Sequence, residues 1–322
     1  MKKILFNFVQ YRKFYYLLSA LVIVPGLIAM IYSTVTTGAP VQLGIEFTGG
    51  SLFELQFTEV VTEEEITAAF AELGMTDIVL QELNPIGEDA VSGSRWQVRT
   101  SFVDPTAVEA IKISLSENVA PLDEAATSVV QVSPIIGSEV TQSALIATVV
   151  AAVVILLFIM FAFRQVPHAV RYGICAISAM VHDILVVMSV MSILGLLLGW
   201  QADALFLTAL LTVVGFSVQD SIVVFDRIRE NSKRRRGEAY DILVNRSVLE
   251  TIHRSLATQL NAFFIMAALL LFGGDTIKQF VAILFVGLLS GTYSSIFHAV
   301  PLLVSWEKGE IPLISRRRRQ TA

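Results

Sequence analysis

The chain has very few of the residues that build disulfides and metal sites. It holds one cysteine, Cys175, and four histidines among 322 residues. A lone cysteine excludes an intramolecular disulfide, and the cysteine and histidines show no metal-ligand spacing. We therefore expect neither a bound metal nor another cofactor.

Motifs of common catalytic centres are also missing. The sequence has no G-x-S-x-G nucleophile turn, no Walker A phosphate loop and no H-E-x-x-H metal-binding helix. We therefore do not expect an enzyme. Any work that the chain performs must draw on an ion gradient or on a partner.

Charge is scarce, whereas long apolar runs dominate. Charged residues make up 16% of the chain and hydrophobic residues 54%, where a soluble domain averages about 25% charged residues. This composition predicts a polytopic α-helical membrane protein. Six runs are long enough to cross a bilayer: about Phe14–Tyr32, Leu145–Phe163, Val170–Leu197, Leu205–Phe225, Leu256–Phe272 and Phe280–Val304.

Lysine and arginine are distributed unevenly about these six runs. The two ends, and the loops on the same side as the ends, carry 19 of the 23 basic residues. By the positive-inside rule, both termini are predicted to be cytoplasmic. We expect the first run to be a retained anchor instead of a cleaved signal peptide, because it is longer than a usual signal sequence and Pro40 would follow the cleavage site.

The runs divide the chain into four parts. We predict a cytoplasmic N-terminus with the first span (1–32), an outer domain (33–142), five further spans (143–304) with a cytoplasmic loop at 226–254, and a basic tail (305–322). The outer domain carries 17 acidic and three basic residues. This balance favours solubility and argues against binding to nucleic acid.

The outer domain is predicted to be an α+β domain. Strands are expected at Ser51–Phe57, Ile78–Leu83, Arg95–Ser101 and Thr127–Val132, and helices after the capping pattern Thr62–Glu65 and after Asp104-Pro105. The resulting order, βαββαβ, is that of a ferredoxin-like domain. That fold hosts many functions, so it predicts none by itself.

A glycine-rich segment precedes the first strand of this domain. Its residues Gly44, Glu46, Gly49 and Gly50 are interpreted as a turn or docking segment. A phosphate-binding loop would need a following lysine and the start of a helix, and the sequence predicts neither.

Asp220 lies inside the fourth apolar run, where an ionised carboxylate is costly and usually faces a bundle interior to perform a task. Asp226 is predicted at the cytoplasmic boundary, which places Asp220 about 9 Å deeper at the α-helical rise. We predict that Asp220 exchanges protons. The alternative is a structural carboxylate held by a permanent partner.

The fourth run is polar over a wide arc. Five residues share one helical stripe: Thr208, Thr212, Gly215, Gln219 and Asp226. Asp220 lies about 100° from Gln219, and Ser217 lies farther round. A helix polar over so wide an arc needs protein neighbours on most sides.

Polar residues of two other runs are candidates to join Asp220. Arg254 opens the fifth run and either points inward as a partner of Asp220 or extends to the surface. His182 and Asp183 lie in the third run and either relay protons or serve packing. Because adjacent residues of a helix point about 100° apart, His182 and Asp183 are not automatically a hydrogen-bonded pair.

Spaced glycines and basic clusters are weaker signals. Four glycines are spaced to permit close helix packing: Gly195, Gly199, Gly287 and Gly291. The clusters Lys233–Arg236 and Arg316–Arg319 could attract anionic lipid or ribosomal RNA. Anchoring of the membrane topology is the simpler explanation for both clusters.

The fourth run resembles the signature of the SecD/SecF family of protein-export membrane subunits. The matching string is Phe206–Asn231, with support from Gly44–Gly50, Val181–Asp183, Phe272–Gly274 and Gly291–Phe297. The resemblance covers nearly the whole chain. One six-span unit with a large loop after the first span is also similar to half of an RND-type transporter.

The resemblance implies a subunit of the bacterial cytoplasmic membrane that pairs with a SecD-type half and joins the SecYEG channel. It would use proton flow to promote late stages of preprotein translocation and release on the outer side, in contact with unfolded preproteins and membrane lipids. Asp220 matches the family's proton-carrying aspartate, and Arg254 matches a basic residue of the same pathway. Protons are thus the implied coupling ion.

The chain departs from the family pattern at several positions. Glu46 stands where the family usually has Asp, and Phe216 where it usually has Tyr. After Arg254, the residues Gln259, Asn261 and Ala262 replace part of a hydroxyl-rich run. Amides can also hold water, so Gln259 and Asn261 remain candidates for the pathway.

Two other functions remain open at this point. Half of an RND-type efflux or lipid transporter would fit the six spans, but an insert of about 110 residues leaves little room for a substrate pocket of several subdomains. The second is a non-transporting assembly factor in which Asp220 is only structural.

Overall fold

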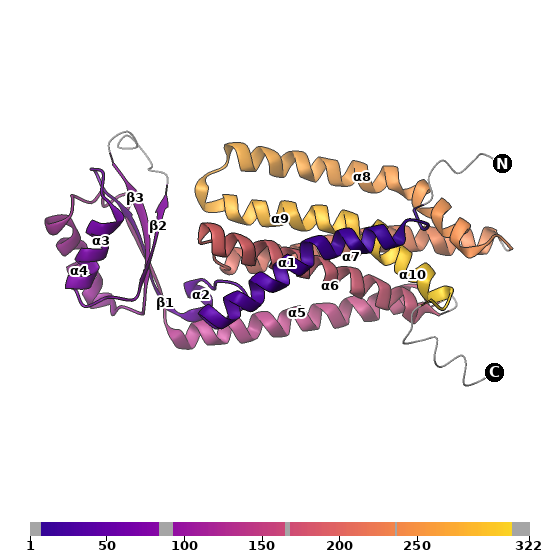
Figure 1. The fold of residues 1–322 in the computed structure, drawn as a ribbon, viewed down its shortest axis with the longest axis horizontal. Helices are drawn as coiled ribbons and strands as arrows, with labels where there is room; N and C mark the ends of the chain where they lie inside the picture. The colour runs from indigo at the N-terminus through magenta and orange to yellow at the C-terminus, as the bar shows by residue number, and fades with distance from the viewer. Residues whose placement is uncertain (1–7, 84–92, 165–167, 236, 311–322) are drawn as a thin grey trace. The chain divides into compact units, whose positions relative to one another are not determined.

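The computed structural model describes residues 8–83, 93–164, 168–235 and 237–310. The chain divides into two compact units (Figure 1). The helix bundle comprises Met1–Val41, Ala147–Trp200 and Leu205–Ala322, and the α+β unit comprises Gln42–Ile146 and Gln201–Ala204.

Six helices of the described residues are long and apolar enough to cross a membrane, which confirms the six predicted spans. They are α1 (Arg12–Thr37), α5 (Pro134–Ala162), α6 (Ala169–Leu198), α7 (Ala204–Arg234), α8 (Tyr240–Phe272) and a last span, Ile277–Glu307. The last span is built from α9 (Asp275–Ser294), the π-helical turn η2 (Ser295–Ala299) and α10 (Val300–Glu307).

Two of the helices extend into the predicted outer domain at 33–142. Helix α1 continues to Thr37, and α5 begins at Pro134. In this part of α1 two threonine hydroxyls are satisfied within the helix, because Thr34 and Thr37 donate to the carbonyl oxygens of Met30 and Ser33 at 2.7 and 2.8 Å. Hydropathy marks where the apolar residues end, and the helices continue beyond them.

The predicted loop at 226–254 is largely helical, which corrects that prediction. Helix α7 continues to Arg234, and α8 begins at Tyr240. The charged residues that lower the hydropathy here form contacts between the two helices. Arg227 Nε donates to Glu250 Oε2 at 2.6 Å, and Asn231 Nδ2 donates to Ser247 Oγ at 3.0 Å. Most of the predicted tail, including Arg316–Arg319, lies outside the described residues, as does Arg236.

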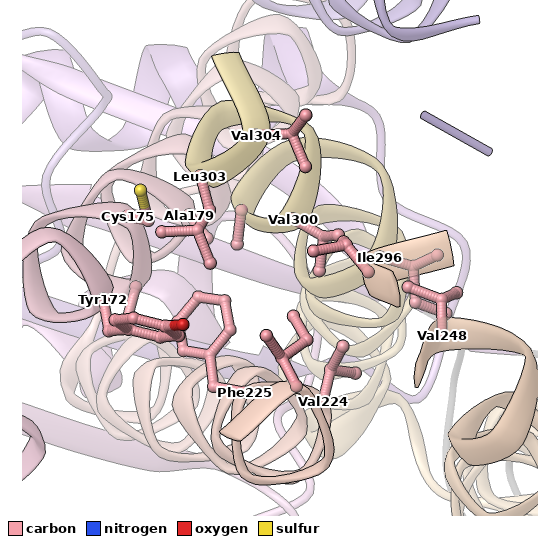
Figure 2. Packing of buried hydrophobic residues seen from close by; sticks show 14 of the residues in the cluster. Tyr172, Cys175, Ala179, Val224, Phe225, Val248, Ile296, Val300, Leu303 and Val304 are labelled. Atoms are coloured by element: carbon pink, nitrogen blue, oxygen red, sulfur yellow. The ribbon is translucent and has the colours of Figure 1, made fainter. Parts of the chain in front are cut away.

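An apolar core joins α6, α7, α8 and the last span of the bundle, and it includes Ile159 of α5. Figure 2 shows Tyr172 of α6 against Phe225 of α7, with ring centroids 5.3 Å apart and ring planes at 89°. The lone cysteine, Cys175, is buried in the same cluster. The other residues labelled in the figure are Ala179, Val224, Val248, Ile296, Val300, Leu303 and Val304. Their burial fixes α6, α7, α8 and the last span against one another.

Glycines mark the closest helix approaches in the bundle. A Cβ at Gly26 of α1 would collide with Ser189 of α6, and one at Gly287 of α9 would collide with Val213 of α7. A Cβ at Gly291 would lie 3.3 Å from Ser217 Cα. Gly199 differs from its predicted packing role: it ends α6 at a φ of 68°, with its N–H donating to the carbonyl of the buried Gly195 and open space at its Cβ position.

The α+β unit contains a four-stranded antiparallel sheet with strand order β2-β3-β1-β4. The strands are β1 (Gly50–Gln56), β2 (Ile78–Leu83), β3 (Arg95–Thr100) and β4 (Ser128–Val132), and the helices are α3 (Glu63–Glu72) and α4 (Pro105–Asn118). Every one of these strands lies within one residue of its predicted bounds. The helices begin where the capping signals predicted them.

Alternation along β1 builds the core of this unit. Phe53 and Leu55 are fully buried and form one apolar cluster with Phe70 of α3 and Leu115 of α4. Thr62 and Glu65 form the predicted capping box at the start of α3. Both helices therefore cover the same face of the sheet.

The glycine-rich segment before β1 contains a one-turn helix, α2 (Ile45–Thr48), which the sequence did not predict. Gly49 and Gly50 follow with φ angles of 76° and 137°, where glycine carries no steric penalty. A Cβ at Gly49 would lie 2.5 Å from Pro134 Cα, and one at Gly50 would lie 2.7 Å from the Thr100 carbonyl oxygen. Both positions therefore require glycine.

A short strand-like contact attaches the residues before α7 to this segment. The N–H of Gly44 donates to the carbonyl of Ala202 at 2.6 Å, and the N–H of Ala202 donates to the carbonyl of Gln42 at 2.7 Å. Residues Gln201–Ala204 therefore belong to the α+β unit, although α7 begins at Ala204.

Candidate functional site

Asp220 is buried in α7, with 6% of its surface exposed. Its Oδ2 accepts a hydrogen bond of 2.7 Å from Gln259 Nε2 of α8, and Gln259 is itself buried. The sequence identified both residues as candidates for a proton pathway, but it did not predict that they contact each other. A carboxylate with one amide donor can bind a proton without losing a charged partner.

The register of α8 on α7 follows from contacts nearer to the α7–α8 connection. Glu250 accepts from both Arg227 and Asn231, at 2.6 and 2.9 Å. Gln259 lies nine residues beyond Glu250 on the same helix. These polar contacts between α7 and α8 thus align α8 so that the Gln259 amide reaches Asp220.

Two serine hydroxyls flank Asp220 along α7. Ser217 and Ser221 are fully buried, and their Oγ atoms have no hydrogen-bond partner in the described part of the chain. They are four residues apart, so they lie on one side of the helix next to Asp220. Buried polar groups without a protein partner commonly bind water. A water molecule bound beside Asp220 would satisfy these hydroxyls.

The polar stripe predicted on α7 faces away from the rest of this chain. Gly215, Gln219 and Asp226 are exposed, and nothing lies within 4 Å of the Cβ position of Gly215. Asp226 pairs with Arg229 one turn along the helix, at 2.5 Å. The stripe is thus separate from Asp220 and Ser217, which point into the bundle.

Arg254 and Asn261 lie on exposed positions of α8. Among the described residues, no ion pair joins Arg254 to Asp220; Gln259 is the residue of α8 that contacts the carboxylate. The prediction that Arg254 acts in the proton pathway therefore has no contact with Asp220 in the described part of the chain to support it.

His182 and Asp183 form a hydrogen-bonded pair, with 3.0 Å between Nδ1 and Oδ1. Asp183 also accepts hydrogen bonds of 2.6 Å from Ser290 and Ser294 of α9. Neither serine was predicted to be a site residue. Their signal is the four-residue spacing of two hydroxyls in the sixth apolar run, which places them on one helix face.

A second group of charges lies in the α+β unit, outside the spanning helices. Burial raises the pKa of Glu46, and the nearby Asp203 raises it further. Burial lowers the pKa of Arg99 to about 10, against the opposing effect of Glu46 and Asp203. These three residues bring α2, β3 and the segment before α7 into one electrostatic cluster.

Two family models match the chain. One, described as "Protein export membrane protein SecD/SecF, C-terminal", matches residues 111–309. The other, described as "SecD/SecF GG Motif", matches residues 35–59. The first range includes α5 through α10 with Asp220, and the second includes the Gly44–Gly50 segment.

Relatives and a solved structure agree with these models. The protein translocase subunit SecF of Thermobaculum terrenum is 42% identical over 323 residues, which cover 98% of each chain. The protein translocase subunit SecDF of Bacillus subtilis is 30% identical over 95% of this chain and 38% of its own length. The crystal structure of SecDF, a translocon-associated membrane protein from Thermus thermophilus, matches with a TM-score of 0.78 and 29% identity, over 96% of this chain and 40% of that chain. This chain thus spans less than half the length of either SecDF protein.

Proposed function

The chain belongs to the SecD/SecF family of protein export membrane proteins, and from this we propose that it is a proton-coupled accessory subunit of a protein translocase. It would use the proton motive force to promote late stages of preprotein translocation, without enzymatic chemistry of its own. The observation that carries the proposal is Asp220, a buried carboxylate on a spanning helix with an amide donor and adjacent unpaired hydroxyls. The relatives are named translocase subunits, which does not favour the efflux or lipid transporter.

The partner that this proposal requires is a SecD-type second half. In the SecDF relatives one chain is more than twice as long as this one. The exposed polar stripe on α7 supports such a partner. Lipid chains offer the Gln219 amide no hydrogen-bond partner, and the open space at the Cβ position of Gly215 permits another helix to pack closely there. We propose that the second half covers this stripe and that Arg254 completes the pathway there. The SecYEG channel and unfolded preproteins would be the further partners.

We propose that the α+β unit is a ferredoxin-like domain on the outer side of the bacterial cytoplasmic membrane, with both termini inside. The strand order β2-β3-β1-β4, with α3 and α4 on one face, supports the fold. The unequal distribution of lysine and arginine supports the orientation.

Proton exchange at Asp220 would change its contact with Gln259. An ionised carboxylate accepts the Gln259 N–H as a charge-assisted hydrogen bond, which is stronger than the bond to a neutral carboxyl. Protonation weakens that hydrogen bond and gives Asp220 an O–H group that can donate to water or to the hydroxyl of Ser217 or Ser221. The strength of the hydrogen bond between α7 and α8 therefore depends on whether Asp220 is protonated.

The chain offers a route from α7 to the α+β unit. Helix α7 begins directly after Asp203, and Ala202 is held to Gln42 and Gly44 by two backbone hydrogen bonds. A shift of α7 along its axis would strain these two hydrogen bonds. We propose that this connection transmits protonation at Asp220 to the outer domain.

The test replaces Asp220 by Asn in the complex with its SecD-type partner. Asn keeps the shape and accepts the Gln259 N–H, but it cannot ionise. We expect preprotein translocation into vesicles to lose its stimulation by the proton motive force, while association with the partner stays normal. Asp226→Asn is the matched control, since Asp226 is an exposed carboxylate on the same helix, and it should retain the stimulation. Normal stimulation in Asp220→Asn would overturn the proposal.

A further inference from the structure

A second buried carboxylate, Asp183, is the centre of a polar network that the proposed function does not use. Asp183 is fully buried in α6. Its Oδ1 accepts from Ser290 and lies 3.0 Å from His182 Nδ1, and its Oδ2 accepts from Ser294. An ionised carboxylate is purely an acceptor, so His182 Nδ1 must carry a proton in this contact.

The network continues from the other ring nitrogen of His182 into α1. His182 Nε2 lies 2.9 Å from Ser19 Oγ, and Ser19 Oγ lies 3.4 Å from the Tyr293 hydroxyl oxygen. The Tyr293 hydroxyl donates to the carbonyl of Tyr15 at 2.6 Å. The series thus passes from α6 through α1 to α9 and back to α1.

The protons available do not satisfy this series when His182 is neutral. Four contacts follow one another: Asp183 to His182, His182 to Ser19, Ser19 to Tyr293, and Tyr293 to Tyr15. Each needs one proton between its two atoms, and a neutral His182 with the hydroxyls of Ser19 and Tyr293 provides three. Ser19 must then donate either to His182 or to Tyr293, and one contact remains without a hydrogen.

One added proton satisfies all four contacts. With both nitrogens of His182 protonated, Nδ1 donates to Asp183 and Nε2 donates to Ser19. Ser19 is then free to donate to Tyr293. The added proton also neutralises the pair, since among the described residues no other cation pairs with Asp183. A neutral pair avoids an isolated charge within the spanning helices.

We propose that His182 and Asp183 form a proton-binding site, separate from Asp220, whose occupation completes the hydrogen-bond link of α1 to α6 and α9. Its titratable neighbours are Tyr293 and His298 of the last span, with ring centroids 5.9 and 5.0 Å from His182, and Tyr16 of α1, whose ring lies 5.8 Å from His298. His298 lies 3.0 Å from Ser178 through its own Nε2 and does not take part in the series.

The proposal does not depend on proton transfer by Asp220. Asp220 contacts α8 through Gln259, whereas the Asp183 network involves α1, α6 and α9. The two sites share no hydrogen-bond partner among the described residues. Loss of one site can therefore be tested with the other intact.

Nuclear magnetic resonance of ring-15N histidine in the purified full chain, in lipid nanodiscs, tests the site. The chain has four histidines, so His182→Gln assigns the His182 signals. We expect Nδ1 to be protonated at every pH and Nε2 to gain a proton on acidification. Asp183→Asn should lose the doubly protonated form, whereas Asp220→Asn should leave it unchanged even if proton-coupled translocation is lost.

A milder variant, with a matched control, keeps the test decisive if Asp183→Asn does not fold. Ser19→Ala removes the acceptor for Nε2–H and leaves the dyad in place, so the doubly protonated form should decline. Ser178→Ala removes a hydroxyl that contacts only His298 in this group and should have no effect on His182. A single neutral form of His182 at every pH where the protein is folded would overturn the proposal, as would an unchanged titration in both Asp183→Asn and Ser19→Ala.

Discussion

Asp183 on α6 and Asp220 on α7 are both buried in the helix bundle, but their surroundings differ. Asp183 accepts two serine hydrogen bonds and contacts His182. Asp220 accepts from Gln259 and has the unpaired hydroxyls of Ser217 and Ser221 beside it. Burial is thus similar at both positions, whereas the number of donors is not. A carboxylate with several fixed donors stays ionised and held in place, whereas one with a single donor can itself take up a proton.

The two sites also differ in how much of their surroundings this chain supplies. The partners of Asp183 come from α6 and α9 of the same chain, and α1 joins the network through the contact of Ser19 with His182. Helix α7 carries Asp220 on its inner side and an exposed polar stripe with Gly215 and Gln219 on its outer side. One site is complete within the chain, and the other borders a face that a second six-helix half would cover.

The largest expected effect is the difference in stability when each carboxylate is removed. Asp183→Ala removes the acceptor of three donors: Ser290 and His182 lose it outright, and Ser294 keeps only the Gly291 carbonyl at 3.3 Å. Each unsatisfied buried group costs about 1–3 kcal/mol. Asp220→Ala leaves one such donor. We therefore expect the free energy of unfolding in mixed micelles to fall by several kcal/mol for Asp183→Ala and by about 1 kcal/mol for Asp220→Ala. Equal losses would contradict the contrast between the two sites.

A smaller effect is expected from substituting two glycines, Gly287 of α9 on the buried side of α7 and Gly215 on the exposed side of α7. In Gly287→Ala the new methyl group meets Val213, and overpacking of this kind costs about 1–3 kcal/mol. Gly215→Val adds bulk on the open face, so it should leave the unfolding free energy of the isolated chain almost unchanged. It should instead weaken co-purification with the SecD-type half. If Gly215→Val associates normally, the stripe is not the interface.

The smallest effect concerns Glu46, a third carboxylate, in the α+β unit. Burial raises the pKa of Glu46, so its ionisation costs stability once the pH exceeds its folded pKa, and that cost disappears below its unfolded pKa. We expect Glu46→Gln to increase hydrogen-exchange protection of Gln42–Gly50 in the full chain at neutral pH. The gain should vanish as the pH falls into the ordinary glutamate range. A loss of protection at neutral pH would show that ionised Glu46 is stabilising through Arg99.

The α+β unit could be predicted closely because its signals are local. Thr62 and Glu65 mark the start of α3, Asp104-Pro105 marks the start of α4, and alternation marks β1. The short helix α2 was missed because its formation depends on packing: Gly44 is fixed by Ala202, more than 150 residues later in the chain.

The sites in the bundle were predicted only in part. The sequence identified Asp220 because a carboxylate in an apolar run is unusual. It could not identify Gln259 as the partner of Asp220, because that contact depends on the register between α7 and α8. The His182–Asp183 contact was left open, since helix geometry separates adjacent side chains by about 100°. The imidazole bridges that angle, and Ser290 and Ser294 complete the site from another helix.

Coupling to proton flow requires Asp220 to gain and lose a proton in the folded protein. Infrared difference spectroscopy during a pH step, on the complex with the SecD-type half in lipid vesicles, detects this proton. We expect a carboxylic-acid band on acidification that disappears in Asp220→Asn and persists in both Asp226→Asn and Asp183→Asn. If the spectrum of Asp220→Asn matches that of the unsubstituted protein, Asp220 does not exchange protons.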